Sequence, residues 1–113
     1  MAVLPLNTFR TITRSLTNSA QTLYTCPTGV TGIVLLAQVS NTSTPAVTAS
    51  VTFSHVRQRT ETELVKNCPV PPEDARSVLT GRLVLEEGDR ITVVASANNT
   101  LKIVMSVVES ANT

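Results

Sequence analysis

The side chains able to carry catalysis are few in this 113-residue chain and lie far apart in sequence. His55 is the single histidine, and no serine or cysteine nucleophile motif accompanies it. Most carboxylates fall in stretches that read as turns, where they cap and solubilise. Catalysis needs titratable groups that converge on one site. We therefore predict that the chain is not an enzyme, that it has no catalytic residue, and that His55 is structural.

Motifs for cofactors and metals are missing as well. The four glycines form no P-loop, dinucleotide fingerprint or calcium loop. A structural zinc site needs about four ligands, and His55, Cys26 and Cys68 are too few and too widely spaced. We predict no metal, no cofactor and no small-molecule substrate. The two cysteines are expected as free thiols, as is usual in a cytosolic chain, with a single disulfide as the alternative.

Charge and aromatic content exclude further classes of protein. The formal net charge is +1 and the pI about 7.8, so we predict no surface basic enough to bind nucleic acid. The aromatic residues are Tyr24, Phe9 and Phe53, without tryptophan. So small a set argues against a stacking platform for sugars or single-stranded nucleic acid.

Targeting signals are not visible in the sequence. Residues 1–6 lack a basic region and a long apolar run, so we expect no signal peptide and synthesis in the cytoplasm. The longest apolar run, residues 33–37, is far shorter than the ~20 residues of a membrane-spanning helix. We predict no membrane contact.

The elements that hold these side chains are predicted to be strands. Thr and Val, with 18 and 16 residues, are β-branched and suit a pleated sheet. Residues 47–55 and 101–108 alternate with period two, and residues 33–39 are almost continuously apolar. Weaker strand patterns cover residues 10–16, 21–26, 61–67, 77–85 and 90–96. The arginines of residues 10–16 mark that segment as an edge strand.

Turn residues separate the predicted strands. Asn, Asp, Gly and Pro cluster at residues 18–20, 27–29, 41–45, 86–89 and 97–100. Residues 67–75 contain three prolines and form the longest predicted loop, with at most one helical turn near residues 73–78. We predict an all-β domain, an antiparallel β-sandwich of jelly-roll or immunoglobulin-like type with about eight strands.

The start of the chain is a candidate contact surface. We predict an apolar arm at residues 1–8 and a single domain at residues 9–113. An exposed apolar arm needs a partner, and the alternative is that it folds back across its own sheet. Arginine suits protein contacts, and the alternative is intramolecular pairing with glutamate. The candidate interface residues are Val3, Leu4, Leu6, Phe9, Arg10, Arg14 and Arg57.

The C-terminal half carries a recognisable layout. Its parts are Leu85-Glu86-Glu87-Gly88-Asp89-Arg90-Ile91 within residues 78–91, then Asn99-Thr100-Leu101, then a final strand at residues 106–109, with further matches at residues 23–29 and 35–41. Over residues 20–110 the chain resembles small β-sandwich virion proteins of tailed bacteriophages, particularly cyanobacterial phages. The resemblance implies an oligomer, often a trimer, without catalytic residues. It also implies a hairpin in which Gly88 takes a positive φ and Asp89 makes a turn hydrogen bond.

The resemblance leads to a functional prediction. We predict a capsid decoration (cement) protein, located in the virion and made in the host bacterial cytoplasm. It would bind the outer surface of the major capsid protein, or other virion proteins, and stabilise the shell. A tail, neck or baseplate component is the alternative within the same class. A carbohydrate-binding module is the alternative from another class.

Overall fold

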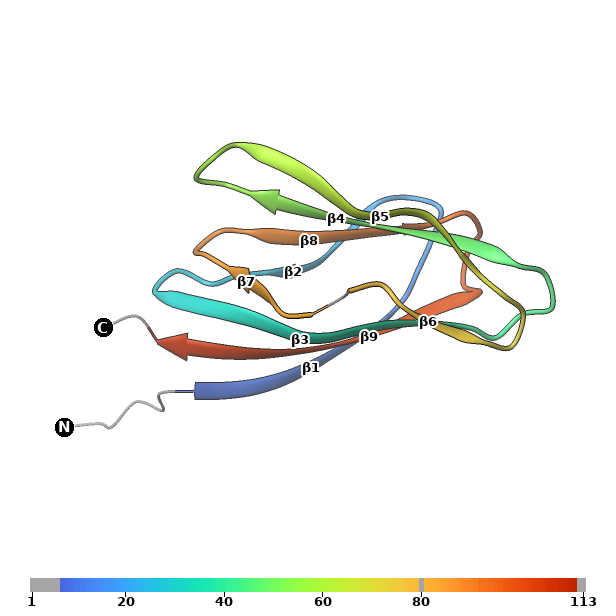
Figure 1. The fold of residues 1–113 in the computed structure, drawn as a ribbon, viewed down its shortest axis with the longest axis horizontal. Coiled ribbons are helices and arrows are strands. Elements are labelled where there is room, and N and C mark those ends of the chain that lie inside the picture. The colour runs from blue at the N-terminus through green and yellow to red at the C-terminus, as the bar shows by residue number, and fades with distance from the viewer. Residues whose placement is uncertain (1–6, 80, 112–113) are drawn as a thin grey trace.

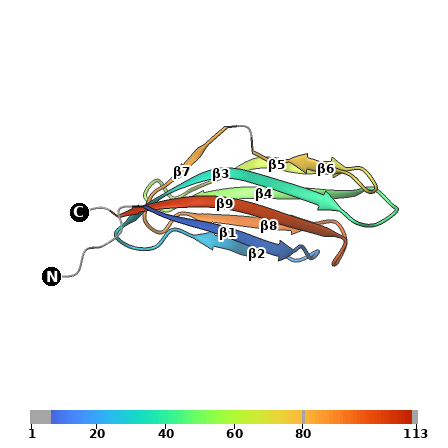
Figure 2. The ribbon, with the colours of Figure 1, turned by 90° about the horizontal axis from the view of Figure 1, so that it is seen from below.

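The computed structural model describes residues 7–79 and 81–111, which form two antiparallel sheets packed face to face (Figures 1 and 2). Sheet A contains β1 (Asn7–Ser15), β9 (Leu101–Ala111), β3 (Val30–Asn41), β6 (Ala75–Ser77) and β7 (Leu83–Leu85). Sheet B contains β2 (Gln21–Thr25), β8 (Arg90–Ala95), β4 (Val47–His55) and β5 (Thr60–Val70). The predicted all-β antiparallel sandwich is confirmed. The described ranges contain no helix of the length and hydropathy that crossing a membrane requires.

The core lies between the two sheets and follows from the alternation of the long strands. Val51 and Val93 come from sheet B, and Ile103 and Met105 from sheet A, each with at most 2% of its surface exposed. Burying such a side chain contributes about 1.5–3 kcal/mol to the stability of the folded state. Leu16, just after β1, is also fully buried. The core thus anchors β1 at its C-terminal end.

One predicted strand is two strands in the structure. Residues 77–85 were expected to be continuous, but β6 and β7 are separate short strands that both pair with β3. Between them Val78 N donates to Ala37 O at 3.0 Å, and Gly81 has a φ of +87°. The described residues therefore hold nine strands rather than about eight. No helical turn forms at residues 73–78.

The predicted loop at residues 67–75 is wrong over its first half. β5 continues through Pro69 to Val70, with Pro69 opposite Thr48. The backbone of Thr48 is turned toward β8, because its carbonyl oxygen accepts from Ser96 N at 2.9 Å. Pro69 therefore faces a position that needs no N–H donor. β5 is also an edge strand, where proline is tolerated.

β1 is an edge strand of sheet A, so the edge strand predicted at residues 10–16 is present, as Asn7–Ser15. It pairs with β9 alone, along its whole length and without a register shift. Residues 1–6, which include Val3, Leu4 and Leu6 of the predicted arm, lie outside the described residues. The last two residues of the predicted arm, Asn7 and Thr8, already belong to β1.

Candidate assembly surface

The outer face of sheet A carries a row of apolar side chains that crosses four strands. The register places Phe9 of β1 opposite Val108 of β9, Val108 opposite Ile33 of β3, and Ile33 opposite Val84 of β7. Residues opposite each other in a sheet point to the same face. Phe9 is 75% exposed and Val84 54% exposed, while the two residues between them are half-buried. We call these four residues the apolar row.

Further apolar side chains extend the row along the same face. The β3–β9 register shifts between Val34 and Leu36, and this bulge leaves both Leu35 and Leu36 exposed. Val104, one strand away, is 38% exposed. Among the described residues, six large apolar side chains are exposed, and all of them except Val56 belong to sheet A. A continuous exposed apolar patch typically marks a contact with another macromolecule.

Sheet B presents a different outer face. Thr52 of β4 lies opposite Thr92 of β8, and Thr92 lies opposite Thr22 of β2, so hydroxyl groups cross this sheet where apolar groups cross sheet A. Threonine hydroxyl groups form hydrogen bonds with water. Exposure of the Phe9 ring to water, in contrast, is unfavourable. This contrast makes the outer face of sheet A the candidate contact surface.

Two predicted interface residues, Arg10 and Arg14, tie β1 to its own chain. Arg10 Nη1 lies 3.3 Å from Glu109 Oε2, and its guanidinium carbon lies 5.9 Å from the centroid of the Tyr24 ring. Arg14 Nη1 donates to Thr22 O at 3.1 Å. These are the intramolecular pairings that the sequence left open. Phe9, in contrast, makes no such bond and projects outward.

A polar clamp joins the sheets beside β1. The Tyr24 hydroxyl of sheet B donates to Glu109 Oε2 of sheet A at 2.5 Å. Burial, then the hydrogen bond to Glu109, raises the pKa of Tyr24. Gly32 makes room for this ring, because a Cβ at that position would lie 3.3 Å from the Tyr24 oxygen. A glycine inside a strand is the sequence signal for such close approach, and it was not used in the prediction of contact residues.

His55 belongs to a second polar cluster, at the end of β4. Asp89 Oδ1 accepts from Val56 N at 2.9 Å, and Asp89 Oδ2 accepts from Glu86 N at 2.8 Å and from His55 Nδ1 at 3.0 Å. Asp89 is fully buried. Burial alone would raise the pKa of Asp89, but these hydrogen bonds outweigh it and lower the pKa below its ordinary value. The turn hydrogen bond implied for Asp89 and the positive φ of Gly88 (83°) are both present. The implied hairpin is wrong, because β7 before the turn lies in sheet A and β8 after it lies in sheet B.

The same cluster has the composition of a cation site. Ligand atoms of His55, Glu86 and Asp89 lie within 4.8 Å of one another. The Asp89 oxygens are already occupied by three donors, and Arg57 Nη2 lies 3.1 Å from Glu86. A guanidinium beside Glu86 opposes a second cation there. The contacts therefore favour a structural role, in which His55, Glu86 and Asp89 hold two turns together, over a metal centre. We call these three residues the turn lock.

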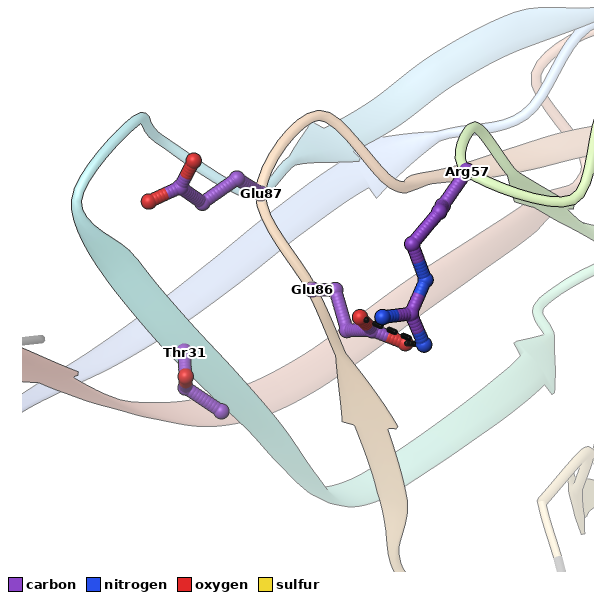
Figure 3. A pocket seen from close by; sticks show the side chains of 4 residues that line it. All are labelled: Thr31, Arg57, Glu86 and Glu87. Carbon is purple, nitrogen blue, oxygen red and sulfur yellow. Dashed lines mark hydrogen bonds and ion pairs between the residues drawn. The ribbon is translucent and has the colours of Figure 1, made fainter.

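Arg57, the last of the predicted interface residues, lies at the surface of this lock. Figure 3 shows its side chain reaching Glu86 across a hollow of about 290 Å³, which Thr31 and Glu87 also line. Glu87 Oε1 accepts from Gly29 N at 2.8 Å. Both carboxylates that line the hollow are therefore already bonded within the chain. It offers no convergent set of groups for catalysis among the residues that the structure describes.

The lock makes the stability of the fold sensitive to acid. The folded-state pKa of Asp89 is lower than the unfolded value of about 3.8, so the unfolded chain binds more protons between the two values. Asp89 therefore contributes fully above pH 3.8, and its contribution is lost as the pH falls through the folded-state pKa. We expect the free energy of unfolding, measured by urea titration between pH 7 and pH 2, to fall below pH 4. An Asp89→Asn variant that keeps the full acid dependence would contradict this assignment.

The two cysteines are free thiols in this structure. Cys26 is buried, and its Sγ lies 3.3 Å from Val30 O. Burial raises the pKa of the Cys26 thiol, which lowers its reactivity. Cys68 is half-buried on the edge strand β5. Among the described residues, both thiols contact backbone carbonyl oxygens.

Comparison with known proteins supports the fold. No family model and no curated protein matches the chain. A solved structure of Bacillus endospore appendages, described as disulfide-linked pili, has a TM-score of 0.57 at 12% identity and covers 100% of this chain and 98% of that chain. The acid-stable capsid of Helicobacter pylori bacteriophage KHP30 has a TM-score of 0.58 at 13% identity, covering 98% and 92%.

A third solved structure matches over part of its length. The chain spans 37% of a chain from infectious bursal disease virus, Gx strain, with a TM-score of 0.51 at 10% identity over 95% of this chain. Identities this low show a shared fold and nothing finer. The protein is an antiparallel β-sandwich, and it shares this jelly-roll-like fold with chains of two viral capsids and of a bacterial spore pilus.

Proposed function

We propose that the protein is a structural component of a phage virion, and within that class a capsid decoration protein that binds the outer surface of the major capsid protein. Its fold is shared with a phage capsid over nearly the whole of both chains. The polar clusters around Tyr24 and around His55 are both closed by bonds within the chain. The proposed contribution to the virion is therefore contact area rather than chemistry.

The apolar outer face of sheet A is the observation that carries this proposal. Sheet A exposes five large apolar side chains, Phe9, Leu35, Leu36, Val84 and Val104. The outer face of sheet B carries a row of threonine hydroxyl groups instead. A flat apolar face can cover a complementary surface repeated by capsid symmetry, where many modest contacts add up. The apolar residues Val3, Leu4 and Leu6 precede β1 in sequence, and we propose that they add to this contact.

Charging the apolar face should weaken capsid binding. Leu36→Lys removes an apolar contact from the centre of the face and adds a charge that must be desolvated, so we expect binding to capsids that lack the protein to weaken about 10-fold or more. Thr52→Lys, on the outer face of sheet B, is the matched control and should bind like the wild type. Co-sedimentation with capsids measures both variants. Equal binding by both variants would remove the apolar face from the contact.

Cryo-electron microscopy of the intact virion locates the protein and tests its class. Density on the shell, above the major capsid protein, is the expected result. Density confined to the tail, neck or baseplate would replace the decoration role with the alternative structural role. Absence from the virion together with binding on a glycan array would support the carbohydrate-binding alternative. Counting the copies at each site tests the oligomer, often a trimer, that the resemblance implies.

A further inference from the structure

β1 is an open sheet edge whose protective features are limited to two arginines, Arg10 and Arg14, that face its own chain. On the other sheet β5 is protected by two register shifts, by Pro69 and by the charged residues Glu61, Glu63 and Lys66. β1 has no proline, no carboxylate and no register shift along its nine residues. No described segment pairs with its outer side. Exposed, regular edges of this kind pair with strands of other chains.

The hydrogen bonds of the neighbouring strands show which backbone groups of β1 point outward. Leu16 N donates to Leu101 O at 2.8 Å, which extends the β1–β9 register by one residue. In an antiparallel pair, bonded positions alternate, so the even-numbered residues of β1 bond to β9. The other side of β9 agrees with this alternation. Thr42 N donates to Thr100 O at 3.1 Å, so even-numbered positions of β9 bond toward β3 and odd-numbered positions bond toward β1. The free N–H and C=O groups of β1 therefore belong to the odd-numbered residues Asn7, Phe9, Thr11, Thr13 and Ser15.

We propose that β1 pairs antiparallel with β1 of a second copy, with Thr11 on the two-fold axis. Three independent conditions select this register. It places Asn7 opposite Ser15 and so overlaps the whole strand. It sets odd residues opposite odd residues, as the free backbone groups demand, and allows about ten hydrogen bonds. It also sets Arg10 opposite Ile12 rather than opposite an arginine of the second copy.

The same register gives the exposed Phe9 ring a surface to cover. Phe9 lies opposite Thr13 of the second copy, and the next strand in that copy presents Val104 beside Thr13. Phe9 and Val104 are both exposed in one copy alone. Arg10 and Arg14 do not oppose the pairing, because each already binds its own chain on the inner side of β1. The two copies together form one continuous sheet whose apolar faces lie on the same side.

The axis at Thr11 is tested by cross-linking in a Cys68→Ser background. Thr11→Cys brings two sulfurs together at the two-fold axis, because bonded antiparallel pairs have Cα atoms ~5.5 Å apart and a disulfide needs less than ~7 Å. Thr13→Cys is the matched control. In this register Thr13 lies opposite Phe9 of the second copy, and Thr13 of that copy is four residues further along the strand, roughly 13 Å away. We expect an oxidised dimer for the first variant only. Cross-linking of Thr13→Cys alone, or of both variants equally, would overturn the register.

Light scattering of the unmodified chain over a range of concentrations tests the pairing itself. The apparent mass should rise from one copy toward two, and Thr11→Pro should hold it at one, since proline removes an N–H that the monomer does not use. Val84→Lys, at the other end of the apolar row, should show the same rise in apparent mass as the wild type. Loss of pairing in Val84→Lys, or a wild-type chain that stays single at every concentration, refutes the proposal. No virion enters this experiment, so its outcome is separate from that of the proposed function.

Discussion

Asp89→Asn is expected to lower the free energy of unfolding by about 3 kcal/mol, because it removes a fully buried carboxylate from three donors. An asparagine can present only one oxygen. Its NH2 group then faces either Val56 N or the pair formed by Glu86 N and His55 Nδ1. At least one buried donor loses its acceptor in either orientation, and a second donor is pushed against it.

The measurement is urea unfolding at pH 7, where the carboxylate of Asp89 is ionised. Glu63→Gln is the matched control, since that carboxylate is half-exposed and its nearest cation, Lys66 Nζ, lies 3.9 Å away. An exposed pair of this kind contributes at most about 1 kcal/mol. Equal small losses in the two variants would show that the turn lock does not stabilise the fold. A large loss in Asp89→Asn alone is the expected outcome.

His55 shows how far local sequence patterns can go. The lone histidine at the end of an amphipathic strand was expected to be structural, and in the structure it contacts Asp89. The Gly88-Asp89 turn was correctly located, but the predicted hairpin is wrong, because the strands on either side of the turn belong to different sheets. That His55 and Asp89 meet depends on the β4–β8 register, in which Ser54 lies opposite Arg90. Register over 34 residues of separation is decided by core packing and not by any local motif. The contact between His55 and Asp89 therefore could not be predicted from the sequence.

The strands were predictable where one face is buried. Residues 47–55 alternate so regularly that the predicted bounds equal those of β4. The errors fall on the edges of the sheets, at β5, β6 and β7, where one side of each strand is unpaired and the hydrophobic pattern weakens. There, prolines mark a protected edge as readily as they mark a loop.

The apolar row could be predicted only in part. Phe9 was a candidate because it ends the apolar stretch at the start of the chain. Ile33 and Val108 sit in apolar stretches that predict burial on both faces, and only the register of four strands brings them level with Phe9. A surface assembled from residues far apart in the chain has no signature in any one of its segments.

Gly32→Val is expected to cost about 3 kcal/mol in the free energy of unfolding, through Tyr24. A Cβ at position 32 would already lie 3.3 Å from the Tyr24 oxygen and 3.6 Å from its ring, and the valine methyl groups extend further into the same space. The ring must leave its place, which costs about 1–3 kcal/mol of packing and the hydrogen bond to Glu109. Gly32→Ala, with its single methyl group, should cost about 1 kcal/mol.

Tyr24 is the single tyrosine of the chain, so ultraviolet absorbance during an alkaline titration follows it alone. Its pKa is raised by burial and by Glu109 in the wild type, and it should fall toward the ordinary value of 10.0 in Gly32→Val because the displaced hydroxyl meets water. A double-mutant cycle with Tyr24→Ala separates this effect from strain in β3. Valine at position 32 should cost little once the ring is gone, since the space is then empty. A full cost without the ring would place the strain in the backbone of β3 and remove the clamp as its cause.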